Sequence, residues 1–203
     1  INECKISDIK KQKNLLENIL KNKKIDISII QGLEIYFDLN LPELINKDYS
    51  LISNKYMLIE FNPNILPQTV SEVFFKLQTL GITPIIAHPE RYTFIQKNIS
   101  LAKKWVRKDY LLQINASSII GNYGKECQKT SMKLISKSLC HLVGSDAHDD
   151  TSRNFCLKDA LVALKKKYND DDISFLKENS SLLVQGKDLL QINFKKKNKF
   201  WFF

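Results

Sequence analysis

The chain has 203 residues but few histidines, arginines and cysteines, and it has no long apolar run. A membrane-spanning helix needs about 20 consecutive apolar residues, so we expect no membrane insertion. The N-terminus is polar and charged, unlike that of a signal peptide. The cysteines are Cys4, Cys127, Cys140 and Cys156, with no CxxC pair among them. This scatter disfavours a zinc finger or a disulfide framework and predicts free thiols in a reducing compartment, the cytoplasm.

Basic residues outnumber acidic ones, which gives a formal net charge of +9. A basic surface is compatible with nucleic-acid binding. The lysines are spread over presumed helix surfaces, however, so we expect no nucleic-acid partner and favour an acidic or phosphorylated one. No low-complexity linker divides the chain, and residues 1–203 are expected to form a single domain.

Short apolar runs alternate with segments that have the apolar spacing of helices. The expected strands are residues 25–30, 56–61, 83–88, 110–116 and 140–147. The expected helices are residues 7–22, 69–81, 100–108, 124–138 and 154–168. Strands that alternate with helices in this way predict successive βα units, a parallel sheet and an α/β fold. Periodicity leaves open whether that sheet is open or closed into a barrel.

Five side chains of the types that bind metals fall near the expected ends of these strands. They are Glu34, Glu60, His88, Asp146 and His148. Because the carboxyl ends of parallel strands form the ligand-binding face of α/β folds, we expect these side chains to share one face. Two glutamates, two histidines and one aspartate suit Mn²⁺, Fe²⁺ or Zn²⁺.

Each of these residues has an ordinary explanation when it is considered alone. Glu34 could be an exposed loop acid, and His88 could be a core histidine. Glu60 is harder to explain, because it lies in an otherwise apolar strand and ionised carboxylates are rarely buried without a partner. The remaining histidine, His141, stands at the start of an expected strand and is interpreted as structural.

Two of the three arginines follow expected metal ligands by a few residues. Arg91 comes shortly after His88, and Arg153 comes shortly after His148. A guanidinium is always charged and can bind two phosphate oxygens at once. Both could be surface arginines, but the chain uses lysine for most of its cations, and this favours a role in phosphate binding.

Five segments together resemble the PHP-type protein tyrosine phosphatases of bacterial capsule and exopolysaccharide operons. The segments are GLEIYF (32–37), LIEF (58–61), IIAHPERY (85–92), QINASSIIGNYG (113–124) and GSDAHDDTSR (144–153). The resemblance implies a distorted (β/α)7 barrel, similar to a TIM barrel, with divalent metal ions at the carboxyl ends of its strands, most often Mn²⁺. It also implies hydrolysis of phosphotyrosine on the tail of a bacterial tyrosine kinase, and thereby control of polysaccharide synthesis.

The resemblance also implies roles for individual residues. The implied metal ligands are Glu34, Glu60, His88, Asp146 and His148, and the implied phosphate-binding catalytic residues are Arg91 and Arg153. No cysteine nucleophile is required. Cys127 and Cys156 indeed lack the CxxxxxR loop that thiol-dependent tyrosine phosphatases use.

The chain departs from that family at its N-terminal end. The family begins with a strand that carries a DxHxH motif, followed by a TPHH-like motif, and this sequence contains neither. Five strands are expected where the family implies seven, so we expect the first two βα units to be missing. The first residue is Ile1, which fits a truncated or split chain. Such a chain is expected to bind metal incompletely and to turn over poorly.

Two other functions are compatible with the sequence. One is another PHP phosphoesterase, such as an enzyme that acts on histidinol phosphate. The other is a degenerate domain that binds a phosphorylated kinase tail without catalysis. The oligomeric state is left open.

Overall fold

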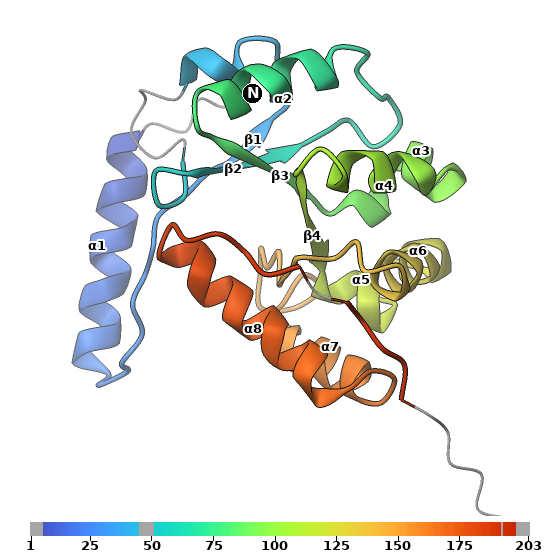
Figure 1. The fold of residues 1–203 in the computed structure, drawn as a ribbon. Helices are drawn as coiled ribbons and strands as arrows, with labels where there is room; N and C mark the ends of the chain where they lie inside the picture. Colours follow the sequence, from blue (N-terminus) through green and yellow to red (C-terminus); the bar gives the residue numbers. More distant parts are fainter. Residues whose placement is uncertain (1–5, 45–50, 192, 198–203) are drawn as a thin grey trace, which may run out of the picture.

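A computed structural model of the chain describes residues 6–44, 51–191 and 193–197. Its centre is a five-stranded sheet with the sequential order β1-β2-β3-β4-β5 (Figure 1). The strands are β1 (Glu34–Tyr36), β2 (Tyr56–Glu60), β3 (Thr83–Ala87), β4 (Leu111–Asn115) and β5 (Leu142–Gly144). All neighbouring strands are parallel, as the alternation of strands and helices predicted.

Helices connect and cover these strands. They are α1 (Ile6–Asn22), α2 (Val70–Thr79), α3 (Thr93–Lys97), α4 (Ser100–Val106), α5 (Ala116–Ile120), α6 (Lys125–Ser136), α7 (Leu157–Lys165) and α8 (Asp170–Val184), with short 3-10 helices η1 (Leu41–Leu44) and η2 (Pro89–Arg91). The five predicted helices correspond to α1, α2, α4, α6 and α7, whereas α3, α5 and α8 were not predicted. In Figure 1, α1 stands to one side of the sheet, and α7 and α8 lie far from α2. Among the described residues, no helix is long and apolar enough to cross a membrane.

The central strands are buried on both faces. Met57 and Ile59 of β2 and Ile85 and Ile86 of β3 have no exposed surface. Strands covered on both faces read as nearly continuous apolar runs, which is why these two were recognisable in the sequence.

The first predicted strand, residues 25–30, is wrong. This segment is not in a strand, and the first strand is instead β1, which begins at Glu34. The apolar side chains of the segment remain in contact with solvent: Ile25 is 43% exposed and Ile27 is 61% exposed. An apolar run forms a buried strand only where the fold supplies a neighbour, and sequence periodicity does not reveal that neighbour.

A glycine ends α2. Gly81 has φ +77°, a left-handed conformation that glycine adopts without strain. Its N–H bonds to the carbonyl of Gln78, and the N–H of Ile82 bonds to that of Leu77, both at 2.9 Å. This pair of bonds is the Schellman arrangement, and it turns the chain directly into β3.

Aromatic packing fixes the end of β2 against the segment that follows β3. Tyr92 is fully buried, and its hydroxyl accepts a 2.9 Å hydrogen bond from the N–H of Phe61. The Phe61 ring lies 5.6 Å from Tyr92 and 5.7 Å from Trp105. Because Phe61 directly follows Glu60 and Tyr92 directly follows Arg91, this cluster sets the distance between two parts of the site.

Candidate metal and phosphate site

All seven predicted site residues line one hollow of about 270 Å³ at the carboxyl ends of the strands. They are Glu34, Glu60, His88, Arg91, Asp146, His148 and Arg153. They come from β1, from β2, and from the segments that follow β3 and β5. The parallel sheet therefore brings together side chains that are far apart in the sequence, as the strand-end argument predicted.

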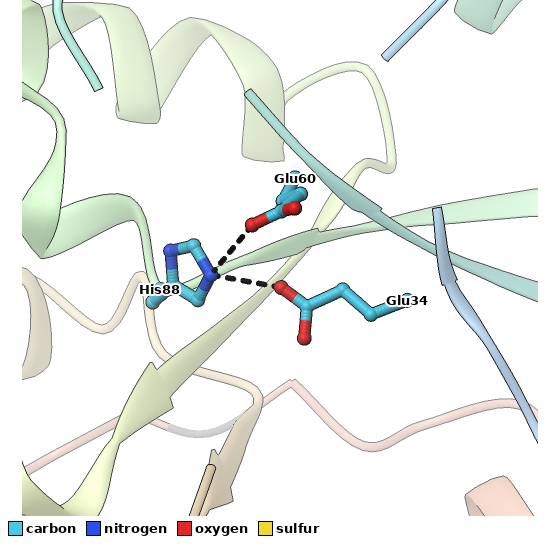
Figure 2. A group of neighbouring side chains, drawn as sticks. All are labelled: Glu34, Glu60 and His88. Atoms are coloured by element: carbon cyan, nitrogen blue, oxygen red, sulfur yellow. Dashed lines mark hydrogen bonds and ion pairs between the residues drawn. The ribbon is translucent and has the colours of Figure 1, made fainter. Parts of the chain in front are cut away.

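Glu34, Glu60 and His88 form the closest group within this hollow (Figure 2). Nε2 of His88 lies 2.8 Å from Oε1 of Glu34 and 3.5 Å from Oε2 of Glu60. One ligand atom of each residue lies within 4.8 Å of the others, a spacing at which all three could bind one ion. Two carboxylates and an imidazole fit a borderline-hard divalent cation such as Mn²⁺, Fe²⁺ or Zn²⁺.

His88 reaches this position through an unusual backbone turn. Its φ of 32° and ψ of 54° place it in the left-handed region, between β3 and η2. The residue is 5% exposed, and its ring packs edge-on against Tyr92 at 5.6 Å. The turn directs the imidazole toward the two glutamates.

The charge around Glu60 explains why a cation suits this group. Partial burial raises the pKa of the Glu60 carboxyl, and the nearby charge of Glu34 raises it further. Two ionised carboxylates that face one imidazole repel each other, and a bound cation would relieve that repulsion.

Asp146 lies outside this group of three and is held by donors. Its Oδ2 accepts hydrogen bonds from Nδ2 of Asn115 at 2.7 Å, from Nη2 of Arg153 at 2.9 Å and from Nη1 of Arg91 at 3.5 Å. The residue also has a left-handed backbone, with φ 50°. In this arrangement, Asp146 orients both predicted phosphate-binding arginines.

His148 is the most exposed of the predicted ligands. Its side chain is 54% exposed, and its Nδ1 donates a 2.9 Å hydrogen bond to the backbone carbonyl of Asp146. The five predicted ligands are thus divided into a compact group of three and a neighbouring pair that lines the same hollow.

Two further side chains contact the site and were not selected from the sequence. Asn115 ends β4, so the strand-end rule that indicates Glu60 also applies to it, although a neutral amide is a weaker sign of a metal site than a carboxylate or an imidazole. Tyr123 lies in the loop between α5 and α6 and contacts both Arg91 and Arg153. Its position follows from the fold of that loop, and no sequence pattern indicates it.

Glu90 of η2 is a buried structural residue beside the site. Its side chain has no exposed surface, and Oε1 accepts a 3.1 Å hydrogen bond from the N–H of Asn115. Burial raises the pKa of the carboxyl. The Glu90 backbone carbonyl also accepts a 2.9 Å hydrogen bond from Nε2 of Gln96. These contacts join η2 to the end of β4 and to α3.

Three of the cysteines, Cys127, Cys140 and Cys156, are free thiols, as predicted, and Cys4 lies outside the described residues. Cys140 is buried, and burial raises the pKa of its thiol. Its sulfur donates to the backbone carbonyl of Leu142 rather than facing the hollow.

Comparisons with known proteins agree with this geometry. CapC from Staphylococcus aureus is 37% identical over 97% of this chain and 79% of its own length. The tyrosine-protein phosphatase YwqE from Bacillus subtilis is 34% identical over 87% of this chain and 70% of its own length. The chain spans 79% and 70% of the lengths of these two relatives, and the comparisons do not support the expected loss of two N-terminal βα units.

A solved structure and a family model also match this chain. A chain from the crystal structures of YwqE from Bacillus subtilis and CpsB from Streptococcus pneumoniae, described as metal-dependent tyrosine phosphatases, aligns with a TM-score of 0.84. That alignment has 32% sequence identity and covers 92% of this chain and 76% of the other. Residues 2–185 match the family described as capsular polysaccharide synthesis, CpsB/CapC. The chain belongs to the CpsB/CapC family.

Proposed function

We propose that this protein is a metal-dependent phosphatase that hydrolyses phosphotyrosine. The observation that carries the proposal is the single hollow in which a carboxylate–imidazole group stands beside two arginines. One part of such a hollow can hold a divalent cation, and the other part can hold the anionic oxygens of a phosphate. The family relationship gives the substrate class, because relatives of this chain carry the name tyrosine-protein phosphatase.

Glu34, Glu60 and His88 would hold the metal ion, with Asp146 and His148 as further ligands at the same hollow. We propose Mn²⁺, with Fe²⁺ or Zn²⁺ as alternatives. A bound divalent ion would polarise the phosphoryl group and lower the pKa of water. Nε2 of His88 and Oε1 of Glu34 lie 2.8 Å apart, so a bound ion would replace the hydrogen bond between them.

Arg91 and Arg153 would bind the phosphate and take part in catalysis. Their side chains are 33% and 31% exposed, so both can be reached from solvent at the mouth of the hollow. Because Asp146 fixes one end of each guanidinium, the remaining N–H groups are already oriented when the phosphate arrives. Donors fixed in advance stabilise the charge that develops on the phosphoryl oxygens without reorganising during the reaction.

We propose that the fold is of the distorted (β/α)7 barrel type, which the five parallel strands in sequential order support. We propose that the substrate is the phosphotyrosine-bearing tail of a bacterial tyrosine kinase and that its hydrolysis regulates capsule or exopolysaccharide synthesis. The three free thiols suit a protein that works in the cytoplasm.

The test is a phosphate-release assay on a phosphotyrosyl peptide with the purified chain and Mn²⁺. We expect turnover that EDTA abolishes and that Glu34→Gln lowers by roughly 100-fold or more, because the variant loses a charged ligand of the ion. Glu126→Gln is the matched control, since Glu126 pairs with Lys129 on the surface of α6, outside the hollow. Turnover of histidinol phosphate alone, or turnover that EDTA leaves unchanged, contradicts the proposal.

A further inference from the structure

We infer that Tyr123 is a positioning residue that holds Arg91 and Arg153 together as one phosphate-binding pair. The inference rests on the proposed phosphatase function and adds to it the residue that organises the arginines. Tyr123 is not among the residues that line the hollow, so it acts through the two guanidiniums rather than on the substrate.

Tyr123 contacts the two arginines in different ways. Its hydroxyl accepts a 3.2 Å hydrogen bond from Nε of Arg153. Its ring faces Arg91, whose guanidinium carbon lies 5.1 Å from the ring centroid. A cation within about 6 Å of an aromatic face is attracted by the ring quadrupole. One side chain therefore binds one arginine through its ring and the other through its hydroxyl.

The loop that carries Tyr123 is held at both ends. Gly121 and Gly124 have φ of +95° and +89°, in the region that glycine adopts readily. The N–H of Gly124 donates a 3.0 Å hydrogen bond to the carbonyl of Gly121, which closes a tight turn around Tyr123. The tyrosine is thereby presented at a fixed place beside the site.

The arginines need such a support because they carry like charges and lie close together. Both reach Oδ2 of Asp146, at 2.9 Å for Arg153 and 3.5 Å for Arg91. One carboxylate cannot offset two guanidiniums, and long side chains that are about one-third exposed lose conformational freedom when they bind a ligand. Tyr123 supplies an acceptor and an aromatic face without adding a negative charge that would repel phosphate.

The contacts use only part of each guanidinium. Arg153 bonds to Tyr123 through Nε and to Asp146 through Nη2, so other N–H groups of its five remain for a phosphate. Arg91 bonds to Asp146 through Nη1, and its plane is supported by the ring. Two guanidiniums that are already oriented bind a phosphate more tightly than two that must be ordered on binding.

The test measures inhibition by inorganic phosphate and the kinetics on a phosphotyrosyl peptide, both with Mn²⁺. Tyr123→Phe keeps the ring and removes the acceptor for Arg153, so the inhibition constant of phosphate and KM should rise roughly 3- to 10-fold. Tyr123→Leu removes both contacts and should raise the inhibition constant of phosphate and KM roughly 10- to 30-fold. Bound Mn²⁺, measured by elemental analysis, should stay unchanged in both variants.

A double-mutant cycle separates positioning from general packing. In an Arg153→Lys background, which lacks the Nε donor, Tyr123→Phe should change the phosphate inhibition constant by less than about 2-fold. Tyr168→Phe is the matched control. It also removes a tyrosine hydroxyl, but Tyr168 packs against Phe194 and does not line the hollow.

The outcomes are distinguishable from one another. If the wild-type chain shows neither turnover nor phosphate inhibition, the proposed function fails and the inference fails with it. If the wild-type chain is inhibited by phosphate and Tyr123→Leu leaves that inhibition unchanged, only the inference is overturned. A loss of bound Mn²⁺ in the Tyr123 variants would also overturn it, because the effect would then arise at the metal ligands.

Discussion

The side-chain amide of Asn115 donates a 2.7 Å hydrogen bond to Oδ2 of Asp146, the same oxygen that accepts from Arg153. Asn115 has no exposed surface and stands at the end of β4, so it is a fixed donor rather than a mobile one. It stabilises the ionised aspartate without bringing a charge of its own, which leaves the arginines free to offset the charge of a phosphate.

We predict that Asn115→Ala weakens metal binding and activity together. Outer hydrogen-bond partners of ligands are worth roughly 10- to 100-fold in metal affinity. The variant should also lose about 1 kcal/mol of unfolding free energy, because Oδ2 of Asp146 loses one of its three donors. Mn²⁺ titration and urea unfolding measure the two effects.

Asn179→Ala is the control for this prediction. Asn179 is also fully buried, and its amide bonds to the backbone of His141 and Leu190 rather than to site residues. Asn179→Ala should lower the unfolding free energy and leave the Mn²⁺ affinity of the folded protein unchanged. Equal losses of Mn²⁺ affinity in both variants would argue against a specific role for Asn115.

We predict that Glu60→Gln has opposite effects on thermal stability with and without metal. Burial and the charge of Glu34 raise the pKa of the Glu60 carboxyl. A raised pKa in the folded state favours folding below the ordinary value, and this contribution is lost as pH rises through the raised value. At pH 7 with EDTA, the ionised carboxylate is therefore unfavourable, and the variant should unfold at a slightly higher temperature than the wild type.

With Mn²⁺ present, the wild type should unfold at a higher temperature than Glu60→Gln. Ligand at about 100 times its Kd stabilises the state that binds it by about 2.7 kcal/mol, so the wild-type Tm should rise by several degrees. The variant should show little rise. Thermal unfolding monitored by circular dichroism checks both halves, and Glu72→Gln, a surface residue paired with Lys76, is the control. Equal Mn²⁺-induced shifts in wild type and Glu60→Gln would show that Glu60 is no ligand.

We predict an acid-sensitive step in stability that arises at His141, away from the hollow. Burial lowers the pKa of this imidazole to about 4, and its Nδ1 accepts a 3.1 Å hydrogen bond from the N–H of Leu112. The unfolded chain therefore binds the proton first, and the stability that the neutral ring contributes is lost as pH falls from 6.5 toward 4. The full difference corresponds to roughly 3 kcal/mol.

His141→Asn isolates this effect, because an amide oxygen can still accept from Leu112 and does not titrate. The unfolding free energies of wild type and variant, measured in urea between pH 4 and pH 8, should diverge below pH 6.5. Parallel curves over that range would assign the acid sensitivity to other groups.

We predict that Arg153→Lys lowers kcat/KM for a phosphotyrosyl peptide by roughly 10- to 100-fold. Lysine keeps the positive charge but lacks the planar guanidinium, which can bind two phosphate oxygens at once. Arg91→Lys should act in the same direction. Arg107→Lys is the matched control, since Arg107 lies at the end of α4 and does not line the hollow. A similar loss in all three variants would point to overall charge rather than to phosphate binding.

The sequence predicted two features best: the strands that are fully buried, and the residues whose side chains can bind a metal ion or a phosphate. The two central strands were recognisable because both of their faces are buried. The strand-end rule selected five of the residues that line the hollow, and the scarcity of arginine in the chain selected the other two, Arg91 and Arg153. β1 was misplaced because it has three residues and a half-exposed pattern that leaves little periodicity to detect. Asn115 and Tyr123 were missed because their roles depend on contacts between segments, which spacing along the chain does not encode.

The left-handed backbones of His88 and Asp146 limit how this protein can change over evolutionary time. Each such conformation costs roughly 1–2 kcal/mol for most residues and is tolerated best by glycine, asparagine, aspartate and histidine. Valine, isoleucine and threonine are therefore excluded at both positions by the backbone alone. Replacement by glycine would relieve the backbone at either position and would also remove a side chain from the hollow, so the stability of the fold and the integrity of the site are opposed at these two residues.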